Sequence, residues 1–388
     1  MAKKQILIIS GEASGDLNAS NLVKSILKID PEIKFSGVGG TLLRQAGVEI
    51  LCDIKELAVI GFFDALKKLP WFLKLQKLIL EKIKSEKPDA VILVDFSGFN
   101  LRLAKKINKA IPAIYYVSPQ VWASRPGRVK TIRKYIHKMI VLFKFEEEFY
   151  KKHGVNVNFV GHPLLDIVKP AMKREEFIAK FNLSGSKTTI ALLPGSRNQE
   201  IDNILPIMLQ ASHLINKDLG WGNVQFLIAK SLQVDWDFYH RKGIDASDLD
   251  LKIVEGKTYE CLELADFALV ASGTATLETA IIQKPFVIIY KMDLLNYLLY
   301  RPQVKIPYIG IVNIIAGKEI IPEFIQFRAK PKTIAKQILK ILKNPLELKR
   351  IKEELNQIKS QLGEKDASLR AAKIILEYLG THPQGDCS

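Results

Sequence analysis

The chain has 388 residues, with 57 Lys or Arg against 41 Asp or Glu, and a formal net charge of +16. This length exceeds what one ordinary hydrophobic core serves and predicts two domains. A hydrophobic content of 48% and a charged content of 25% are those of a folded globular protein and exclude a largely disordered chain. The basic excess favours anionic partners, namely nucleotides, nucleic acid or acidic lipid surfaces, without choosing among them.

The cysteines Cys52, Cys261 and Cys387 lie far apart and form no CxxC pair, which fits a reducing cytoplasm and no disulfide framework. Two lysines and a strand-like segment open the sequence, so we expect no signal peptide. The longest apolar region, residues 57–80, contains Asp64 and four lysines. A membrane-spanning helix needs roughly 18 uncharged residues. We therefore expect a cytoplasmic protein that does not cross a membrane.

Strand-like apolar runs alternate with helical patterns through the first half of the chain. The runs are almost continuously apolar, which is typical of parallel strands buried on both faces. Strands are predicted at residues 5–10, 34–38, 90–94, 113–117, 139–143 and 158–160, and helices at 18–28, 71–84 and 129–135. This order predicts a doubly wound α/β domain that ends near residue 163.

The same pattern restarts after a linker-like helix at about residues 173–181. Strands are predicted at residues 188–193, 224–229, 251–254, 267–271 and 286–290. From residue 330 onward the sequence favours long amphipathic helices, the last at residues 368–379. We predict two Rossmann-like α/β domains: residues 1–168 joined by about 365–388, and residues 169–364.

Two strand-to-helix turns in the second half predict a phosphate site. Ligands of open parallel sheets bind beyond the carboxyl ends of the strands, where helix N-termini present backbone N–H groups and positive dipole ends. The residues of the two turns are Gly195, Ser196 and Arg197, and Ser272, Gly273 and Thr274. Arg197 adds a guanidinium that can hold a diphosphate bidentately. Together the turns predict a nucleotide-diphosphate pocket.

Glu278 lies one helical turn after Thr274 and therefore on the same helix face. A carboxylate there can accept both hydroxyls of a ribose whose phosphates rest on the turn. The alternative is that Glu278 only favours the helix start through the dipole. Its coupling to the turn favours the binding role.

Asp95 directly follows the predicted strand at residues 90–94. Partial burial would raise its pKa above the ordinary value of about 3.9 and make it a better base for a hydroxyl nucleophile. The alternative, a cap of the next helix, stays open.

Two other loops follow strands in this half. GEASGD at residues 11–16 is a tight turn in which Asp16 can cap the next helix, and the loop at 118–128 carries Trp122, as a ligand wall or as packing.

The segment at residues 60–80 combines aromatic and basic side chains. Those singled out are Phe62, Phe63, Trp71, Phe72, Lys67 and Lys68. Such a surface suits the edge of an anionic membrane, and the alternative is a core-facing helix with solvated lysines, broken at Pro70. DxD pairs at residues 235–237 and 248–250 lie between strands, and no zinc-type spacing occurs. We predict no metal and no cofactor.

Taken together, the motifs resemble the lipid-A-disaccharide synthase family, bacterial glycosyltransferases of the GT-B type. The resemblance rests on SGEASGD (10–16), ELAVIGF (56–62), VDFSGFN (94–100), YVSPQVWA (116–123), FVGHPLLD (159–166), LLPGSR (192–197), ASGTATLE (271–278) and NIIAG (313–317). These occur in order over nearly the whole chain. The fold implied is GT-B: two Rossmann-like domains facing a cleft, with C-terminal helices returning to the first domain.

The resemblance implies transfer of 2,3-diacylglucosamine from UDP to the 6-hydroxyl of 2,3-diacylglucosamine 1-phosphate. The products are the β-1,6-linked disaccharide of lipid A and UDP. An α-linked donor and a β-linked product imply a single inversion, which needs one base. Asp95 matches the family's catalytic Asp, Arg197 would neutralise charge on the leaving diphosphate, and Glu12 matches an acidic position whose role is open.

The resemblance also implies that Asn313 lines the UDP pocket. Acylated substrates imply a peripheral enzyme on the cytoplasmic face of the inner membrane, in contact with its anionic surface and with no nucleic acid. The family exchanges C-terminal segments between two protomers, and the basic tail here is compatible with such a swapped homodimer. The chain departs from the family at Gly98, where many members carry a second Asp, and at Ser124, where many carry Trp.

Two alternatives remain at this stage. One is another GT-B enzyme that uses a UDP-GlcNAc-type sugar, either a transferase with a lipid-linked acceptor or an epimerase. The other is a non-enzymatic basic module that binds nucleic acid or membrane. Such a module would cluster its basic residues on one face, without a base at a strand end or a diphosphate turn.

Overall fold

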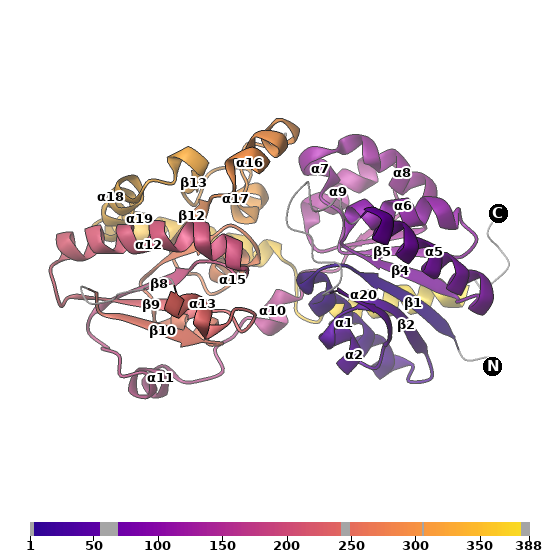
Figure 1. Ribbon diagram of the computed structural model, residues 1–388, viewed down its shortest axis with the longest axis horizontal. Helices are drawn as coiled ribbons and strands as arrows, with labels where there is room; N and C mark the ends of the chain where they lie inside the picture. The colour runs from indigo at the N-terminus through magenta and orange to yellow at the C-terminus, as the bar shows by residue number, and fades with distance from the viewer. Residues whose placement is uncertain (1–3, 55–68, 242–248, 305, 382–388) are drawn as a thin grey trace. The chain divides into compact units, whose positions relative to one another are not determined.

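The computed structural model describes residues 4–54, 69–241, 249–304 and 306–381. The chain divides into two compact units (Figure 1). The first unit comprises Met1–Pro163, Leu299–Lys305 and Leu362–Ser388, and the second comprises Leu164–Leu298 and Ile306–Gln361. Within the described ranges, no helix is both long and apolar enough to cross a membrane.

The first unit is built on a seven-stranded parallel sheet with the order β3-β2-β1-β4-β5-β6-β7. Its strands are β1 (Gln5–Ser10), β2 (Lys34–Gly39), β3 (Glu49–Asp53), β4 (Ala90–Val94), β5 (Ala113–Tyr116), β6 (Lys138–Val141) and β7 (Val157–Phe159). β1 pairs with β2 on one side and with β4 on the other. The strand order therefore reverses between β1 and β4, where such sheets bind their ligands. The loops that follow β1 and β4 lie at this switch point.

Helices cover both faces of the first sheet. They are α1 (Ala13–Ile29), α2 (Thr41–Gln45), α5 (Leu69–Glu86), α6 (Ser97–Ile107), α7 (Val121–Ser124), α8 (Val129–Tyr135), α9 (Lys144–Lys152) and α20 (Ala367–Thr381). The strand period of two divides β1 between two cores, because Leu7 packs with α5 and α6 while Ile8 packs with α1 and α20.

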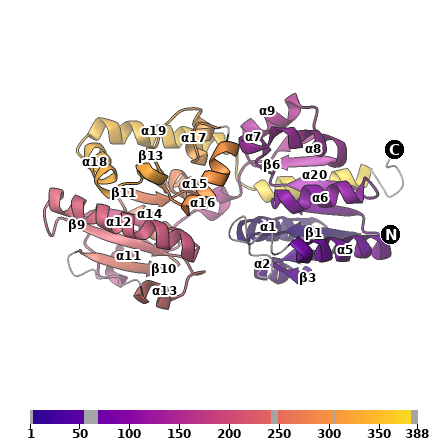
Figure 2. The same cartoon turned by 45° about the horizontal axis from the view of Figure 1, so that its top comes forward.

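The last helix, α20, packs beside α1 on the first sheet (Figure 1, Figure 2). Its Ala371, Ile375 and Leu379 belong to the same buried cluster as Leu22 of α1. These residues follow the spacing of one helix face. The expected return of the C-terminal helix to the first domain is confirmed.

The second unit repeats the plan with six parallel strands in the order β10-β9-β8-β11-β12-β13. Its strands are β8 (Thr188–Leu193), β9 (Val224–Lys230), β10 (Leu251–Glu255), β11 (Phe267–Ala271), β12 (Phe286–Tyr290) and β13 (Glu323–Ile325). The order reverses between β8 and β11, which pair directly. The two turns predicted to bind phosphate follow these two neighbouring strands.

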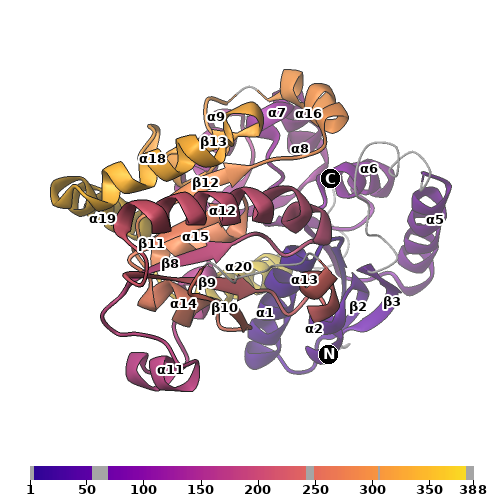
Figure 3. The same ribbon diagram turned by 60° about the vertical axis from the view of Figure 1, so that its left-hand side comes forward.

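Helices flank this sheet as well. They are α10 (Leu164–Ile167), α11 (Arg174–Lys180), α12 (Asn198–Leu219), α13 (Trp236–Arg241), α14 (Thr258–Leu264), α15 (Thr274–Ile281), α16 (Leu294–Tyr300), α17 (Ile311–Ala316), α18 (Pro331–Leu342) and α19 (Pro345–Gln361). α12 and α18 run side by side (Figure 3). The expected doubly wound α/β architecture with two parallel sheets is confirmed.

Beyond shifts of one or two residues at element ends, the structure departs from the predicted elements in β3, β13 and α1. β3 and β13 were not expected, and each is a short edge strand of its sheet. α1 begins at Ala13, so the turn after β1 is only two residues long. Asp16 lies inside α1 and caps a different helix. Its carboxylate accepts the N–H groups of Gly40 at 2.7 Å and Leu42 at 3.0 Å, at the start of α2.

Candidate active site

Asp95 stands at the carboxyl end of β4 on an unusual backbone. Asp95 has a φ of 47° and Phe96 a φ of 44°, both in the left-handed region that L-residues rarely adopt. Each such residue costs on the order of 1–3 kcal/mol, and persists only where its surroundings determine it. Here the Asp95 carbonyl accepts the Asn100 Nδ2 at 2.9 Å and the Tyr115 hydroxyl. The strained turn is thus held from α6 and from the neighbouring strand β5.

The first loop packs directly against this turn. A Cβ on Gly11 would lie 2.3 Å from the Phe96 ring. A Cβ on Gly15 would lie 2.6 Å from the Ser10 Oγ and 3.9 Å from the Asp95 Cβ. The glycines of GEASGD therefore allow the loops after β1 and β4 to approach closely.

Burial raises the pKa of the Asp95 carboxyl to about 7. The negative charge of Glu12 contributes to this rise, and a hydrogen bond from the Phe96 backbone opposes it. Glu12 is exposed at the N-cap of α1. A carboxylate with a pKa near neutrality is well matched to general-base catalysis, because it is partly ionised at pH 7 and still holds a proton strongly.

An aromatic cluster supports the same turn from α5. The ring centroids of Phe72 and Phe96 are 6.0 Å apart, and those of Phe96 and Phe99 are 5.4 Å apart. Trp71 meets Phe72 edge to face. Trp71 and Phe72 are thus half-buried against the first core, and their predicted membrane role stays a prediction. Phe62, Phe63, Lys67 and Lys68 lie outside the described residues.

The loop after β5 is anchored by a buried carboxylate that the sequence did not point to. Glu146 on α9 is 3% exposed, and it accepts the Ser118 hydroxyl at 2.6 Å and the Trp122 Nε1 at 3.2 Å. Tyr150, one turn further along α9, donates its hydroxyl to the Pro119 carbonyl at 2.9 Å. Burial raises the pKa of Glu146 to about 7, against the hydrogen bonds that it accepts. Trp122 is therefore fixed from inside the fold.

In the second unit, Gly195, Ser196 and Arg197 connect β8 to the N-terminus of α12. Gly195 has a φ of 121°, and a Cβ there would lie 2.6 Å from the Glu200 Oε2. The Glu200 carboxylate accepts the Ser196 N–H at 3.2 Å and pairs with the Arg197 Nη1 at 3.1 Å. A carboxylate thus already occupies the donors predicted for a diphosphate. Anionic groups are favoured at this helix end.

The second turn, Ser272–Gly273–Thr274, connects β11 to α15, whose N-cap is Gly273. The Ser272 N–H donates to the Ile289 carbonyl at 2.9 Å, so the sheet uses that donor. Glu278 lies on α15 and accepts the Tyr259 hydroxyl at 3.0 Å. Burial raises the pKa of Glu278, and the Tyr259 hydrogen bond opposes the shift. Because β8 and β11 are neighbours, both turns lie at the same edge of the sheet.

Asn313 is fully buried on α17 with both amide atoms engaged. Its Oδ1 accepts the N–H groups of Ile320 and Ile321, and its Nδ2 donates to the Ile321 carbonyl and to Glu323 at 2.8 Å each. The residue therefore braces the connection that leads into β13. A direct contact with UDP, as the family resemblance implies, stays a prediction.

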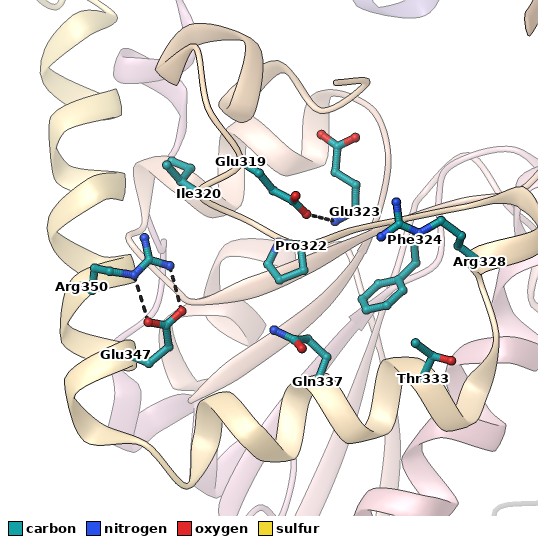
Figure 4. Close-up of a pocket in the computed structure, with 10 residues that line it drawn as sticks. All are labelled: Glu319, Ile320, Pro322, Glu323, Phe324, Arg328, Thr333, Gln337, Glu347 and Arg350. Carbon is teal, nitrogen blue, oxygen red and sulfur yellow. Dashed lines mark hydrogen bonds and ion pairs between the residues drawn. The ribbon is translucent and has the colours of Figure 1, made fainter. Parts of the chain in front are cut away.

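A cavity of about 390 Å³ opens beside the edge strand β13 of the second unit. α18 and α19 contribute to its walls, and its Arg350 forms a two-bonded ion pair with Glu347 (Figure 4). Among the described residues, its lining contains none of the predicted site residues. In the described ranges, no three His, Cys, Asp or Glu side chains gather as a metal site would require.

Two parallel sheets, each flanked by helices, make up a fold of the GT-B type. A putative UDP-N-acetylglucosamine 2-epimerase from Listeria monocytogenes shares this fold, with a TM-score of 0.62, 12% identity and coverage of 99% of this chain and 98% of that one. The calicheamicin glycosyltransferase matches with a TM-score of 0.60, 14% identity and coverage of 99% and 100%. These likenesses concern the fold alone.

The sequence comparisons identify the family. A family model described as lipid-A-disaccharide synthetase matches residues 6–378. A protein of Syntrophus aciditrophicus named lipid-A-disaccharide synthase is 42% identical over 388 residues, which cover 100% of both chains. This chain belongs to the lipid-A-disaccharide synthase family and is a glycosyltransferase. The family match does not favour the epimerase or the non-enzymatic alternative.

Proposed function

We propose that this protein transfers 2,3-diacylglucosamine from UDP to the 6-hydroxyl of 2,3-diacylglucosamine 1-phosphate. The observation that carries the proposal is Asp95, a carboxyl with a pKa of about 7 on a braced turn at the switch point of the first sheet. Membership of the synthase family supports the choice of substrates. The products are the β-1,6-linked disaccharide and UDP.

The chemistry is a single displacement. As the acceptor's 6-oxygen attacks the anomeric carbon, the Asp95 carboxylate takes the hydroxyl proton, and the bond from that carbon to UDP breaks. The leaving UDP gains negative charge, which Arg197 and the N-terminus of α12 stabilise. The α-linkage of the donor inverts to β, so no covalent enzyme intermediate is needed.

The remaining site residues divide between the two substrates. For UDP, the proposed residues are Gly195, Ser196, Ser272, Gly273, Thr274, Glu278 and Asn313. Glu278 would accept the ribose hydroxyls beside the turn that holds the phosphates. Glu12 would tune Asp95 through its charge, because it already raises the pKa of that carboxyl.

The transfer assay tests the reaction and its base. Wild-type protein with both substrates and EDTA is expected to yield the disaccharide by mass spectrometry. General bases contribute roughly 100- to 10,000-fold, so Asp95→Asn should lose about that much activity and still bind UDP. Asp89→Asn is the matched control, since Asp89 lies at the opposite end of β4 and accepts the Gln5 N–H.

Two outcomes would contradict the proposal. Full activity in Asp95→Asn would move the base elsewhere, with Glu12 the first candidate. If the wild-type protein binds UDP but forms no disaccharide, the proposed acceptor is wrong. Binding of single-stranded DNA at physiological salt without binding of UDP would favour the non-enzymatic alternative instead.

The exposed face of α5 supports a peripheral position on the cytoplasmic face of the inner membrane. Leu69 and Leu73 are 40% and 58% exposed, and Lys74 and Lys77 are exposed beside them. A basic and apolar face of this kind binds anionic lipid surfaces. Leu73→Ser should weaken flotation with vesicles containing phosphatidylglycerol, and Leu346→Ser, at an exposed leucine of the second unit, should not. Equal flotation of both variants would show that the exposed face of α5 does not bind the membrane.

A homodimer with exchanged C-terminal segments is the assembly that the family resemblance implies. In the structure, the segment before α20 is hydrogen-bonded to the first unit of the same chain: the His162 N–H donates to the Leu362 carbonyl at 2.9 Å. Arg370 on α20 donates to the Val160 carbonyl at 2.8 Å. Exchange would place the same contacts between two protomers. A single monomeric species by light scattering at micromolar concentration would argue against it.

A further inference from the structure

A cavity of about 270 Å³ lies at the carboxyl edge of the first sheet. Ser97, two residues beyond Asp95, forms part of its wall. The other polar lining groups come from the loop after β5 and from the segment Leu299–Lys305 of the same unit. They are Gln120, Ser124, Arg125, Arg128 and Gln303.

Among the described residues that line this cavity, none is a carboxylate that would balance its positive charge. In the described part of the chain, neither Arg125 nor Arg128 lies within ion-pair distance of an Asp or Glu. Arg125 donates its Nη2 to the Gln303 Oε1 at 2.7 Å, and that amide carries no charge. Burial lowers the pKa of Arg128, and the nearby charges of Arg125 and Arg102 lower it further. Two cations held together in this way favour an anion between them.

The neutral lining adds hydrogen-bond donors. Ser97 and Ser124 contribute hydroxyls, and Gln120 contributes a side-chain amide. Ser97 is also the first residue of α6, an 11-residue helix whose N-terminal dipole end is positive. The planar guanidinium fork matches two oxygens of a phosphate. The donor set therefore fits a phosphate monoester.

We propose that this cavity binds the 1-phosphate of the acceptor sugar, an inference that rests on the proposed function. The acceptor carries its reacting 6-hydroxyl and its 1-phosphate on opposite sides of one ring. The base and the phosphate site must therefore lie about one sugar apart. Ser97 is two residues beyond Asp95, which the chain spans in at most about 7 Å. With the phosphate on Arg125 and Arg128, the 6-hydroxyl is directed toward Asp95.

This arrangement explains acceptor selection. The donor carries a 1-diphosphate esterified to uridine, whereas the acceptor carries a 1-phosphate monoester. A cavity of about 270 Å³ with two arginines can hold the acceptor's phosphate monoester, at the same edge of the sheet as Asp95. An acceptor without the phosphate would leave both cations without a counter-charge and would be used poorly.

The test compares two acceptors in Arg125→Gln, Arg128→Gln and the double variant. The probes are 2,3-diacylglucosamine 1-phosphate and the same sugar without phosphate. Hydrogen bonds to a charged group predict a loss of roughly 10- to 100-fold in kcat/KM for the phosphorylated acceptor. The dephosphorylated acceptor should change little, so the preference for phosphate collapses. Arg128→Lys should restore part of it, and Lys130→Gln, an exposed cation on α8, is the control.

Equal losses with both acceptors would overturn the proposal. So would a weakened affinity for UDP with an unchanged acceptor preference, because the cavity would then serve the donor. Melting temperatures establish that each variant is folded.

If the wild type forms no disaccharide, the proposed reaction is wrong. Calorimetry then tests independently whether the cavity binds phosphate. Binding of glucosamine 1-phosphate to the wild type and its loss in Arg128→Gln would support a phosphate site. Binding of inorganic phosphate alone would show that the sugar is not selected, and no binding of either would reject the cavity.

Discussion

The carboxyl edges of the two sheets reach their backbone shapes by different means. In the first sheet, side-chain-bearing residues adopt left-handed backbone angles, with φ of 47° at Asp95, 44° at Phe96 and 62° at Val117. In the second, the corresponding turns rely on Gly195 at 121° and Gly273 at 153°. The strained backbone of the first sheet positions particular side chains, whereas glycine in the second lets the chain turn at each strand end without that strain.

The two edges also differ in how far Asp95 and Glu146 in the first unit, and Arg197 in the second, are exposed to solvent. In the first unit, burial raises the pKa values of both Asp95 and Glu146 to about 7. In the second, Arg197 is 60% exposed and forms an open ion pair with Glu200. A base gains from partial desolvation, while a diphosphate site needs accessible cations. We infer a division of labour, with proton transfer in the first unit and nucleotide binding in the second.

The largest effect expected at the second sheet tests the nucleotide side of this division. Arg197→Met should lower kcat/KM by roughly 100- to 1000-fold, as loss of a charge-stabilising donor does. It should also weaken UDP binding measured by calorimetry. Lys217→Met, at the other end of α12, is the control. A wild-type affinity for UDP in Arg197→Met would break the comparison, because Arg197 would then not contact the diphosphate.

The buried carboxyl of Glu146 should make the stability of the protein depend on pH. The folded pKa of Glu146 is about 7 and its ordinary value is 4.5, so between these pH values the folded state keeps a proton that the unfolded state has released. The free energy of unfolding should therefore fall as pH rises through this window, by on the order of 3 kcal/mol from Glu146.

Glu146→Gln should flatten that slope, measured by urea unfolding at pH 4.5 and pH 8. Asp95 contributes a slope of the same sign, so some dependence should remain. Glu148→Gln, at an exposed position of the same helix, is the control. An unchanged slope in Glu146→Gln would show that this carboxylate is not held protonated.

A smaller effect concerns the tuning of the base. Glu12→Gln removes a negative charge that raises the pKa of Asp95. The acid limb of the kcat/KM profile against pH should therefore move to lower pH. The limb itself should lie near pH 7 in the wild type, because the ionised form of Asp95 is the active one. Movement to higher pH would mean that Glu12 acts other than through its charge.

The central strands could be predicted from the sequence because their apolar runs are continuous. β1, β4, β8 and β11 begin and end where the pattern places them. β3 and β13 were not predicted because their segments, EILCD and EFI, are short, contain acidic residues and carry no long continuous apolar run. The predicted site residues at strand ends share this advantage, since a sheet gathers its carboxyl ends at one edge.

The supporting residues could not be predicted because long-range packing selects them. Glu146 is the first of three consecutive glutamates, and only the fold determines which one is buried. The one available signal was its spacing of four from Tyr150, which places both on one face of α9. Asp16 likewise caps α2 from 24 residues away, a relation that no local pattern contains.

The smallest expected effect tests whether Glu200 competes with UDP for its donors at the second sheet or helps to position them. The Glu200 carboxylate takes the Ser196 N–H and the Arg197 guanidinium that we assign to the diphosphate. UDP must therefore displace a like charge from the N-terminus of α12. A charge at a helix end is worth about 0.3–1 kcal/mol, so Glu200→Gln should tighten UDP binding roughly 2- to 5-fold. Calorimetry on Asp202→Asn, in the same first turns of α12, gives the control. Weaker UDP binding in Glu200→Gln would mean that the carboxylate holds Arg197 in its binding position, and the exposed edge would then be pre-organised in the same manner as the buried one.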